Sequence, residues 1–161
     1  MAWELLGTST AGGTVTALDV SSIPARNFLL IEINLQTGSS PIEIRFNDSG
    51  TAQEYCHRRI FNGASSGTGT DLTYLLSALG GNDEDKMLIM QVMNLDGEEK
   101  VCVSEAVSNG AQDSAGTYPD RHEHSSIWWN NDQVNKVELS LYSGGTANIL
   151  ANSYINVYGT D

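Results

Sequence analysis

The stretch FLLIEINL, residues 28–35, decides the fold class of this chain. Leu29, Ile31, Ile33 and Leu35 fall on every second position, and the positions between the last three hold a carboxylate and an amide. Successive side chains of a strand point to opposite faces, so this spacing gives one apolar face and one mostly polar face. A helix would need apolar residues three and four positions apart. The stretch is therefore predicted to be a half-buried antiparallel strand.

The same two-residue spacing recurs in other parts of the chain. The apolar residues that share a predicted strand face there are Ile42, Ile44 and Phe46; Val137, Leu139 and Leu141; and Ile155 and Val157. The segment from Met87 to Met93 differs because it is apolar on both faces. That composition predicts a central strand covered on both sides, with a subunit interface as the alternative environment for its methionines.

Turn-forming residues separate these runs at short intervals, as expected for many short strands. Two longer segments of small and polar residues, 62–70 and 109–116, are predicted to be loops. The most plausible place for a short helical turn is residues 71–79, where Asp71 would cap it. Ten or eleven strands remain. They predict one domain, residues 1–161, with an all-β fold: an antiparallel β-sandwich of jelly-roll type.

Acidic side chains outnumber basic ones by 20 to 8, which gives a formal net charge of −12. A surface this negative repels phosphate backbones, so nucleic acid is not expected as a partner. Cys56 and Cys102 are too few for a disulfide framework and are expected to be free thiols. No segment approaches the ~20 apolar residues of a membrane span, and the first residues lack the features of a signal peptide. A soluble protein made in a reducing compartment is expected.

Several patches together resemble a family of small structural proteins from the virions of tailed bacteriophages. In chain order the patches are residues 3–7 (WELLG), residues 42–50 (IEIRFNDSG), Tyr55, Arg58, residues 62–63, Arg121, Glu123, Trp128, Trp129, residues 134–141 and residues 152–159 (NSYINVYG). The resemblance extends over nearly the whole chain. The chain departs from the pattern in two acidic insertions, residues 83–85 and 96–99.

The resemblance implies a jelly-roll or related β-sandwich fold and a structural role in a virion. The role it implies most often is that of a capsid decoration (cement) protein, which binds and stabilises the outer surface of a phage head; a tail component is the other. The implied partners are further copies of the chain, as a homotrimer, and the major capsid protein or another virion protein. The resemblance carries no catalytic residue and no cofactor. The implied location is the virion, after synthesis in the host cytoplasm.

The sharpest candidate for chemistry is the run from Asp120 to His124. On a strand, Asp120, His122 and His124 share one face, and two imidazoles with a carboxylate can hold a divalent metal. The H-x-H step also begins the metal motif of cupins, but the following glutamate and the later histidine are missing. A polar strand face or a subunit contact is therefore preferred, and no metal site is predicted.

Other candidates for chemistry are weaker. No nucleophile motif accompanies the three histidines, so no catalytic residue and no enzymatic activity are predicted. The acidic clusters at 83–85 and 96–99 do not match a calcium-binding EF-hand loop and are predicted to be solvated loop tips.

Five residues are candidates for a contact surface with another protein: Arg45, Arg58, Arg59, Trp128 and Trp129. Arginine suits bidentate pairing with a partner's carboxylate, while exposed arginines scattered on a sheet are the plainer interpretation. Adjacent tryptophans of a strand point to opposite faces, so one is expected in the core and the other at the surface. The alternative function is a carbohydrate-binding or tail- or fibre-associated module, in which the exposed indole stacks on a sugar.

Overall fold

A computed structural model describes residues 2–36, 42–50, 53–77, 85–108, 119–141 and 148–161. Within these ranges every regular element is a β-strand and no helix occurs, so the prediction of an all-β chain is confirmed. The described strands are β1 (Glu4–Thr10), β2 (Ala17–Val20), β3 (Phe28–Gln36), β4 (Ile42–Phe46), β5 (Tyr55–Phe61), β6 (Ala64–Leu72), β7 (Leu76–Ser77), β8 (Asp85–Met93), β9 (Lys100–Ser108), β10 (Asp120–Trp128), β11 (Val137–Leu141) and β12 (Tyr154–Thr160).

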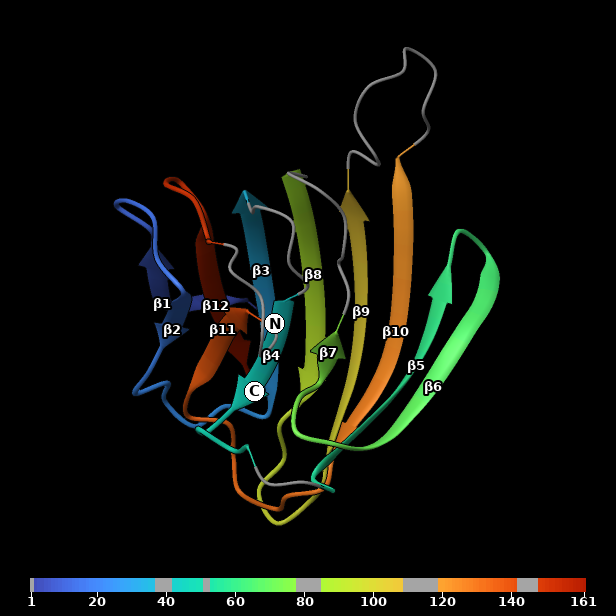
Figure 1. Cartoon of the computed structure of the whole chain (residues 1–161). Coiled ribbons are helices and arrows are strands. Elements are labelled where there is room, and N and C mark those ends of the chain that lie inside the picture. Colours follow the sequence, from blue (N-terminus) through green and yellow to red (C-terminus); the bar gives the residue numbers. More distant parts are fainter. Residues whose placement is uncertain (1, 37–41, 51–52, 78–84, 109–118, 142–147) are drawn as a thin grey trace.

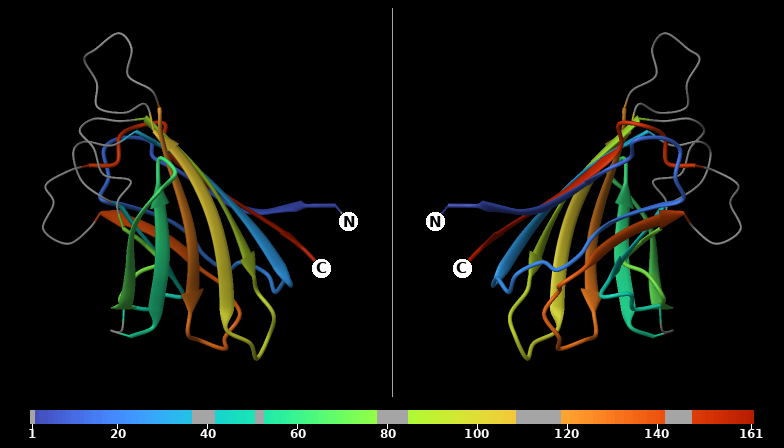
Figure 2. Two further views of the ribbon diagram at one scale, coloured as in Figure 1. Left: turned by 90° about the vertical axis from the view of Figure 1, so that its right-hand side faces the viewer. Right: turned by 90° about the vertical axis from the view of Figure 1, so that its left-hand side faces the viewer.

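The strands form two antiparallel sheets of unequal size. The large sheet has the order β1-β12-β3-β8-β9-β10-β5-β6, and the small sheet has the order β2-β11-β4-β7. Figure 1 shows the small sheet in front of the large one, with β5 and β6 extending beyond it at the right-hand edge. Figure 2 shows the two layers from the sides, with β10, β9, β8 and β3 fanned out in one twisted sheet. The antiparallel β-sandwich is confirmed, whereas its jelly-roll type stays a prediction.

The apolar faces predicted from the alternation form the core. Leu29, Ile31, Ile33 and Leu35 are fully buried between the sheets. The same holds for the predicted apolar residues of β4, β11 and β12 whose burial is described: Ile42, Ile44, Phe46, Val137, Leu139, Ile155 and Val157. All of these residues belong to one cluster of buried side chains, which joins both sheets in a single core.

Large aromatic side chains pack together in the core where β10 ends and β5 begins. The Trp128 ring stacks on Tyr55, with ring centroids 6.1 Å apart, and meets the edge of Phe46 at 5.6 Å. The Tyr55 hydroxyl accepts a hydrogen bond from the Phe46 amide at 3.0 Å. This bond gives the buried phenol a partner, as burial of a polar group requires.

Two local predictions are wrong. The predicted loop over 62–70 is mostly strand β6, since only Asn62 and Gly63, both at positive φ, form the turn after β5. Pairing in a sheet uses main-chain hydrogen bonds, so a Gly- and Ser-rich segment can form a strand when a neighbour offers an edge. The helical turn expected over 71–79 is replaced by the end of β6 and by β7, with residues 78–79 outside the described residues. The second predicted loop, 109–116, also lies outside them.

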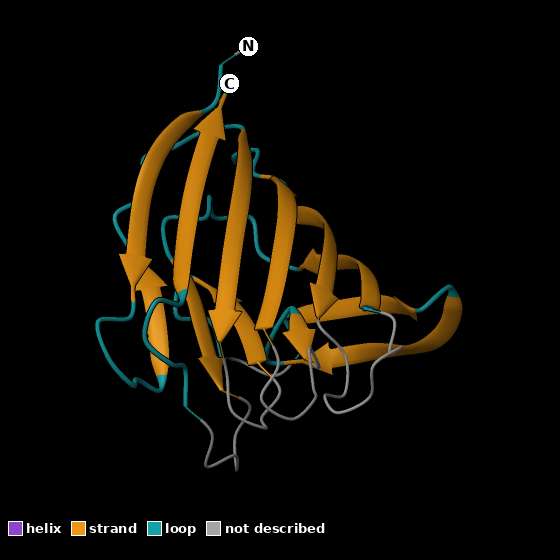
Figure 3. Cartoon of the chain, turned by 90° about the horizontal axis from the view of Figure 1, so that it is seen from above, coloured by secondary structure: helices purple, strands orange, loops and turns teal. Residues whose placement is uncertain are grey.

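Strand β8 confirms one half of its prediction and contradicts the other. It is central in the sheet, hydrogen-bonded to β3 on one side and β9 on the other. Its inner side chains, such as Met90, are buried, but Met87 and Ile89 on the outer face are 50% and 41% exposed. None of the described strands forms a second sheet over that face, because the small sheet covers the inner side. Figure 3 shows the described chain as strands and loops alone, and no helix long and apolar enough to cross a membrane occurs in those residues.

Candidate functional site: the outer face of the large sheet

Strand β9 turns its valines toward solvent. Val101, Val103 and Val107 are 46%, 53% and 46% exposed, while Cys102 and Ala106 on the inner face are almost fully buried. Scattered exposed apolar residues are ordinary, but several on adjacent strands form a patch that usually marks an interaction surface. The β9 valines lie beside Met87 and Ile89 of β8, so they form such a patch.

The orientation of β9 follows from packing on the inner face. In the unbroken register of β8, β9 and β10, Ser104 lies between Met90 and His124. Ala106 likewise lies between Leu88 and His122. These small inner side chains leave room for the larger side chains of both neighbouring strands. If β9 had the opposite orientation, its branched valines would fill that space, and the resulting overpacking would destabilise the core.

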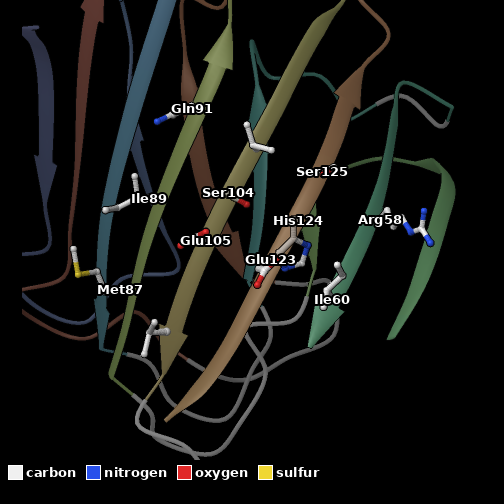
Figure 4. Close-up of a pocket in the computed structure, with 12 residues that line it drawn as sticks. Arg58, Ile60, Met87, Ile89, Gln91, Ser104, Glu105, Glu123, His124 and Ser125 are labelled. Carbon is white, nitrogen blue, oxygen red and sulfur yellow. The ribbon is translucent and has the colours of Figure 1, made fainter. Parts of the chain in front are cut away.

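We call this apolar patch the outer strip. It consists of the half-buried Ile60 of β5 and the exposed Met87 and Ile89 of β8 and Val101, Val103 and Val107 of β9. All of these residues except Val101 line a shallow hollow of about 450 Å³ on the outer face. In Figure 4, Ile60 comes from β5 on one side of the hollow, and Met87 and Ile89 come from β8 on the other. The strip thus spans four adjacent strands, with β10 between β9 and β5.

The charges of the strip are few and nearly balanced. Arg121 lies 3.2 Å from a carboxylate oxygen of Glu105 and 3.2 Å from one of Glu123, so β9 and β10 are bridged at the surface. Arg58 is exposed on the same face, opposite Ser125, and no described side chain pairs with it in a salt bridge. Among the described side chains, two carboxylates and two guanidinium groups therefore adjoin the strip, in a chain whose net charge is −12.

The outer face becomes polar where β3 and β12 continue the sheet. The Glu32 carboxylate accepts hydrogen bonds from the Tyr154 hydroxyl at 3.2 Å, the Asn156 amide at 3.3 Å and the Tyr158 hydroxyl at 3.3 Å. A carboxylate with three donors is well satisfied within its own chain. The polar cluster marks the limit of the outer strip on this side.

The structure separates the five residues predicted to form a contact surface. Arg58 faces outward and lines the hollow, and Trp129 is 49% exposed in the loop after β10. Trp128 is fully buried, as expected for one member of the pair, and is left out of the surface. Arg59 belongs to the inner face of β5, in register with His124, and Arg45 lies on β4 in the small sheet. The structure thus brings only Arg58 to the outer strip.

Arg45 has an internal partner. Its guanidinium lies 2.6 Å from a carboxylate oxygen of Glu43, a residue that is only 2% exposed. Burial raises the pKa of Glu43, while the charge and hydrogen bond of Arg45 act in the opposite direction. This geometry ties Arg45 to a buried carboxylate rather than to a partner protein.

The inner face of β10 does not form the metal site considered from sequence. His122 and His124 do point inward, with ring centroids 6.3 Å apart, and His57 of β5 lies 5.9 Å from His124. Asp120 accepts a hydrogen bond from the Asn62 amide at 2.8 Å. Among the described residues, no three metal-ligating side chains are arranged to hold an ion.

The buried imidazoles are poor bases. Burial, followed by the charges of His57, His122 and Arg59, lowers the pKa of His124 to about 3. Burial and the Arg59 charge also lower the pKa of His57 and of His122. Neither ring nitrogen of His124 has a hydrogen-bond partner. The three imidazoles are therefore neutral at neutral pH, and protonation in acid would place positive charge among groups that disfavour it.

A second hollow, of about 480 Å³, lies among loops at another part of the surface. Its lining is mostly polar and includes Asn47, Asp48, Asp132 and Asn135. The Asn47 side chain is already engaged, since it donates to the Gln133 carbonyl at 2.9 Å and accepts from the Asn135 amide at 2.8 Å. The loop that lines this hollow follows directly after the exposed Trp129.

Comparison with known proteins adds little to this geometry. No family model matches the chain, and no curated protein matches it. Among solved structures, the chain is similar to the carbohydrate recognition domain of Emp46p in its potassium-bound form, with 10% identity over 99% of this chain and 89% of that one. The TM-score of that match is 0.20, which is too low to carry an argument about fold or ligand.

Proposed function

We propose that the chain is a non-enzymatic structural protein of a larger protein assembly, and that the assembly is the virion of a tailed bacteriophage. In this proposal it decorates the capsid, where it binds and stabilises the outer surface of the head. The observation that carries the structural role is the outer strip, an exposed apolar surface of nearly balanced charge on a strongly acidic molecule. The virion and the capsid come from the sequence resemblance.

The composition of the outer strip is that of a contact surface rather than of a surface that stays exposed to solvent. Burying a fully exposed valine, isoleucine or methionine side chain is favourable by about 1.5–3 kcal/mol, and the side chains of the strip, which are about half exposed, gain proportionally less. Protein interfaces are depleted of charge at their centre and enriched in Met and Arg, and the strip has Met87 at its edge and Arg58 and Arg121 around it. The low charge of the strip and the methionine and arginines around it are therefore typical of a contact surface.

The proposal is tested by adding the purified chain to bacteriophage heads that lack decoration protein. We expect the chain to sediment with the heads at a fixed ratio to the major capsid protein and to raise the temperature at which the heads open. A matched sample with an unrelated acidic β-sandwich controls for trapping. Absence of the chain from sedimented heads and from tails would contradict a virion role.

A carbohydrate-binding or fibre-associated module is the second candidate. The observation that favours it is the exposed Trp129, which precedes in sequence the loop that lines a hollow with Asp132 and Asn135. Indole faces and carboxylate or amide side chains are suited to the apolar and hydroxyl faces of a sugar. Binding on a glycan array that is lost in Trp129→Ala, with sedimentation on heads absent, would favour this function over decoration.

A further inference from the structure

We infer that the outer strip is covered by the outer strip of a second copy of this chain. The inference rests on the proposed structural role and names the neighbour that the strip contacts inside the assembly. A two-fold contact between strips pairs two chains, so it differs from the homotrimer that the sequence resemblance implies. Three properties of the described residues lead to a copy rather than to a foreign protein: the distribution of charge, the presence of both charge signs within the strip, and the size of the surface.

The distribution of charge argues that the partner is itself acidic. A basic partner would be matched by an interface rich in carboxylates, because interfaces arrange opposite potentials against each other. Among the side chains that the structure describes, only Glu105 and Glu123 bring carboxylates to the strip, and both contact Arg121. A surface with few carboxylates can contact the same surface of a second acidic chain without strong repulsion.

Both signs of charge occur within the strip, as self-pairing requires. In a two-fold contact, the same patch is used by both copies, so a group on one copy must find its complement on the other. Arg58 is exposed on β5 and has no described salt-bridge partner, while Glu123 lies on the adjacent strand. In such a contact, Arg58 of one copy can pair with a carboxylate beside the strip of the other copy.

The size of the surface also fits. Strands β5, β10, β9 and β8 contain seven, nine, nine and nine residues. At about 3.3 Å per residue and about 4.8 Å between strands, they cover roughly 500–600 Å² in projection. Specific interfaces bury about 600–800 Å² per partner, so two facing strips come close to the lower limit of that range.

The test measures the mass of the full chain in solution by sedimentation and light scattering over a concentration series. We expect reversible self-association that Val103→Glu weakens at least roughly 30-fold, the loss typical of a buried hot spot. Val103→Ser replaces the apolar isopropyl group with a small polar one without adding charge, and it should also weaken association. Leu150→Glu is the matched control, since Leu150 is 40% exposed but lies outside the strip, and it should have little effect.

Salt separates a copy from an oppositely charged partner. Added salt screens the repulsion between two chains of −12 and should strengthen self-association, whereas it would weaken binding to a basic surface. A wild-type chain that stays monomeric at every concentration, in low and in high salt, overturns the inference.

The outcomes also separate this inference from the proposed function. If the wild-type chain is monomeric but binds heads, and Val103→Glu abolishes that binding, the strip contacts the shell: decoration stands and the second copy is rejected. If the chain self-associates through the strip but never binds heads or tails, the copy contact stands and the virion role falls.

Discussion

Lys100 shows how one charged side chain can organise the end of this sandwich. It is fully buried, and its ammonium donates to the carbonyls of Leu95 at 2.8 Å and Asn131 at 3.2 Å, and also to that of Glu98. These carbonyls belong to the turn between β8 and β9 and to the loop after β10. The ammonium thus holds two connecting segments together with main-chain oxygens as its partners, which is how a buried charge is tolerated.

Replacing Lys100 with Met should destabilise the fold by about 2–4 kcal/mol, because several partly buried carbonyls lose their charged donor. Urea unfolding monitored by tryptophan fluorescence measures the loss. Lys136→Met is the matched control, since the Lys136 ammonium pairs with the exposed carboxylate of Asp48 and such pairs contribute under about 1 kcal/mol. Equal losses of unfolding free energy in the two variants would show that the hydrogen bonds from Lys100 to the carbonyls stabilise the fold no more than a surface ion pair does.

His124 makes the stability of the chain sensitive to acid. Its pKa is about 3 in the folded chain and about 6.5 when unfolded, so the unfolded state binds more protons between those values. The stabilisation is complete above about pH 6.5 and is lost as the pH falls toward 3. The nearby His57, His122 and Arg59 all oppose a further positive charge, and Lys86 and Asp120 act on the same cluster through His122.

The corresponding prediction concerns His124→Leu. Between pH 7 and pH 4.5, this variant should lose about 2–3 kcal/mol less unfolding free energy than the wild-type chain, as two pKa units imply. Urea titrations at the two pH values give the difference. An unchanged pH dependence would mean that His124 is protonated in the folded chain, or that the other histidines account for the acid effect.

At the scale of elements, strand β1 of the large sheet comes close to strand β2 of the small sheet. A Cβ atom added to Gly7 would lie 2.5 Å from Cγ1 of Val20, far inside the contact distance of two carbons. Gly7 also lies at the irregularity in the pairing of β1 with β12. The absence of a side chain therefore lets an edge strand of the large sheet approach the small sheet, as glycine in a strand commonly does.

Gly7→Val should cost about 1–3 kcal/mol, because β1 must move away from β2 to admit the side chain. Gly12→Val is the control: a Cβ atom at Gly12 has no neighbour within 4 Å. Thermal unfolding and hydrogen exchange of the β1 amides report the two effects. If both substitutions cost the same, the close approach of the sheets is not what glycine provides at position 7.

The outer strip is also an element-scale feature, and sequence reasoning missed it. The alternation of valines in β9 was present as a signal, but the intervening Cys102, Ser104 and Ala106 are small enough to occupy either face. Alternation separates two faces without saying which one is buried when neither is strongly polar. The register with β8 and β10 decided it, and strand partners are not visible in a single sequence.

At the scale of the whole molecule, one core joins two sheets of unequal size. Leu139 of the small sheet and Leu29 of the large sheet belong to the same buried cluster. The chain is therefore expected to unfold as a unit, with both sheets lost together.

Leu139→Ala tests this unity from the small sheet. The substitution should cost about 2–5 kcal/mol because a fully buried leucine leaves a cavity. The transitions followed by far-ultraviolet dichroism and by tryptophan fluorescence, to which the buried Trp128 of the large sheet contributes, should shift together. A shift in dichroism alone would mean that the small sheet melts separately.

The sequence by itself determined the all-β class, the apolar faces of β3, β4, β11 and β12, and the acidic charge, because alternation and composition are local properties. Tertiary structure alone decided that the Gly-rich segment after Asn62 is a strand, that β9 turns its valines outward and that β8 is covered on one side only. Each of these depends on which strands are neighbours and in what register, and the main-chain hydrogen bonds that set both are nearly independent of side-chain type. The candidate site follows from that choice: the outer strip exists because small residues on the inner face of β9 make room for the imidazoles of β10.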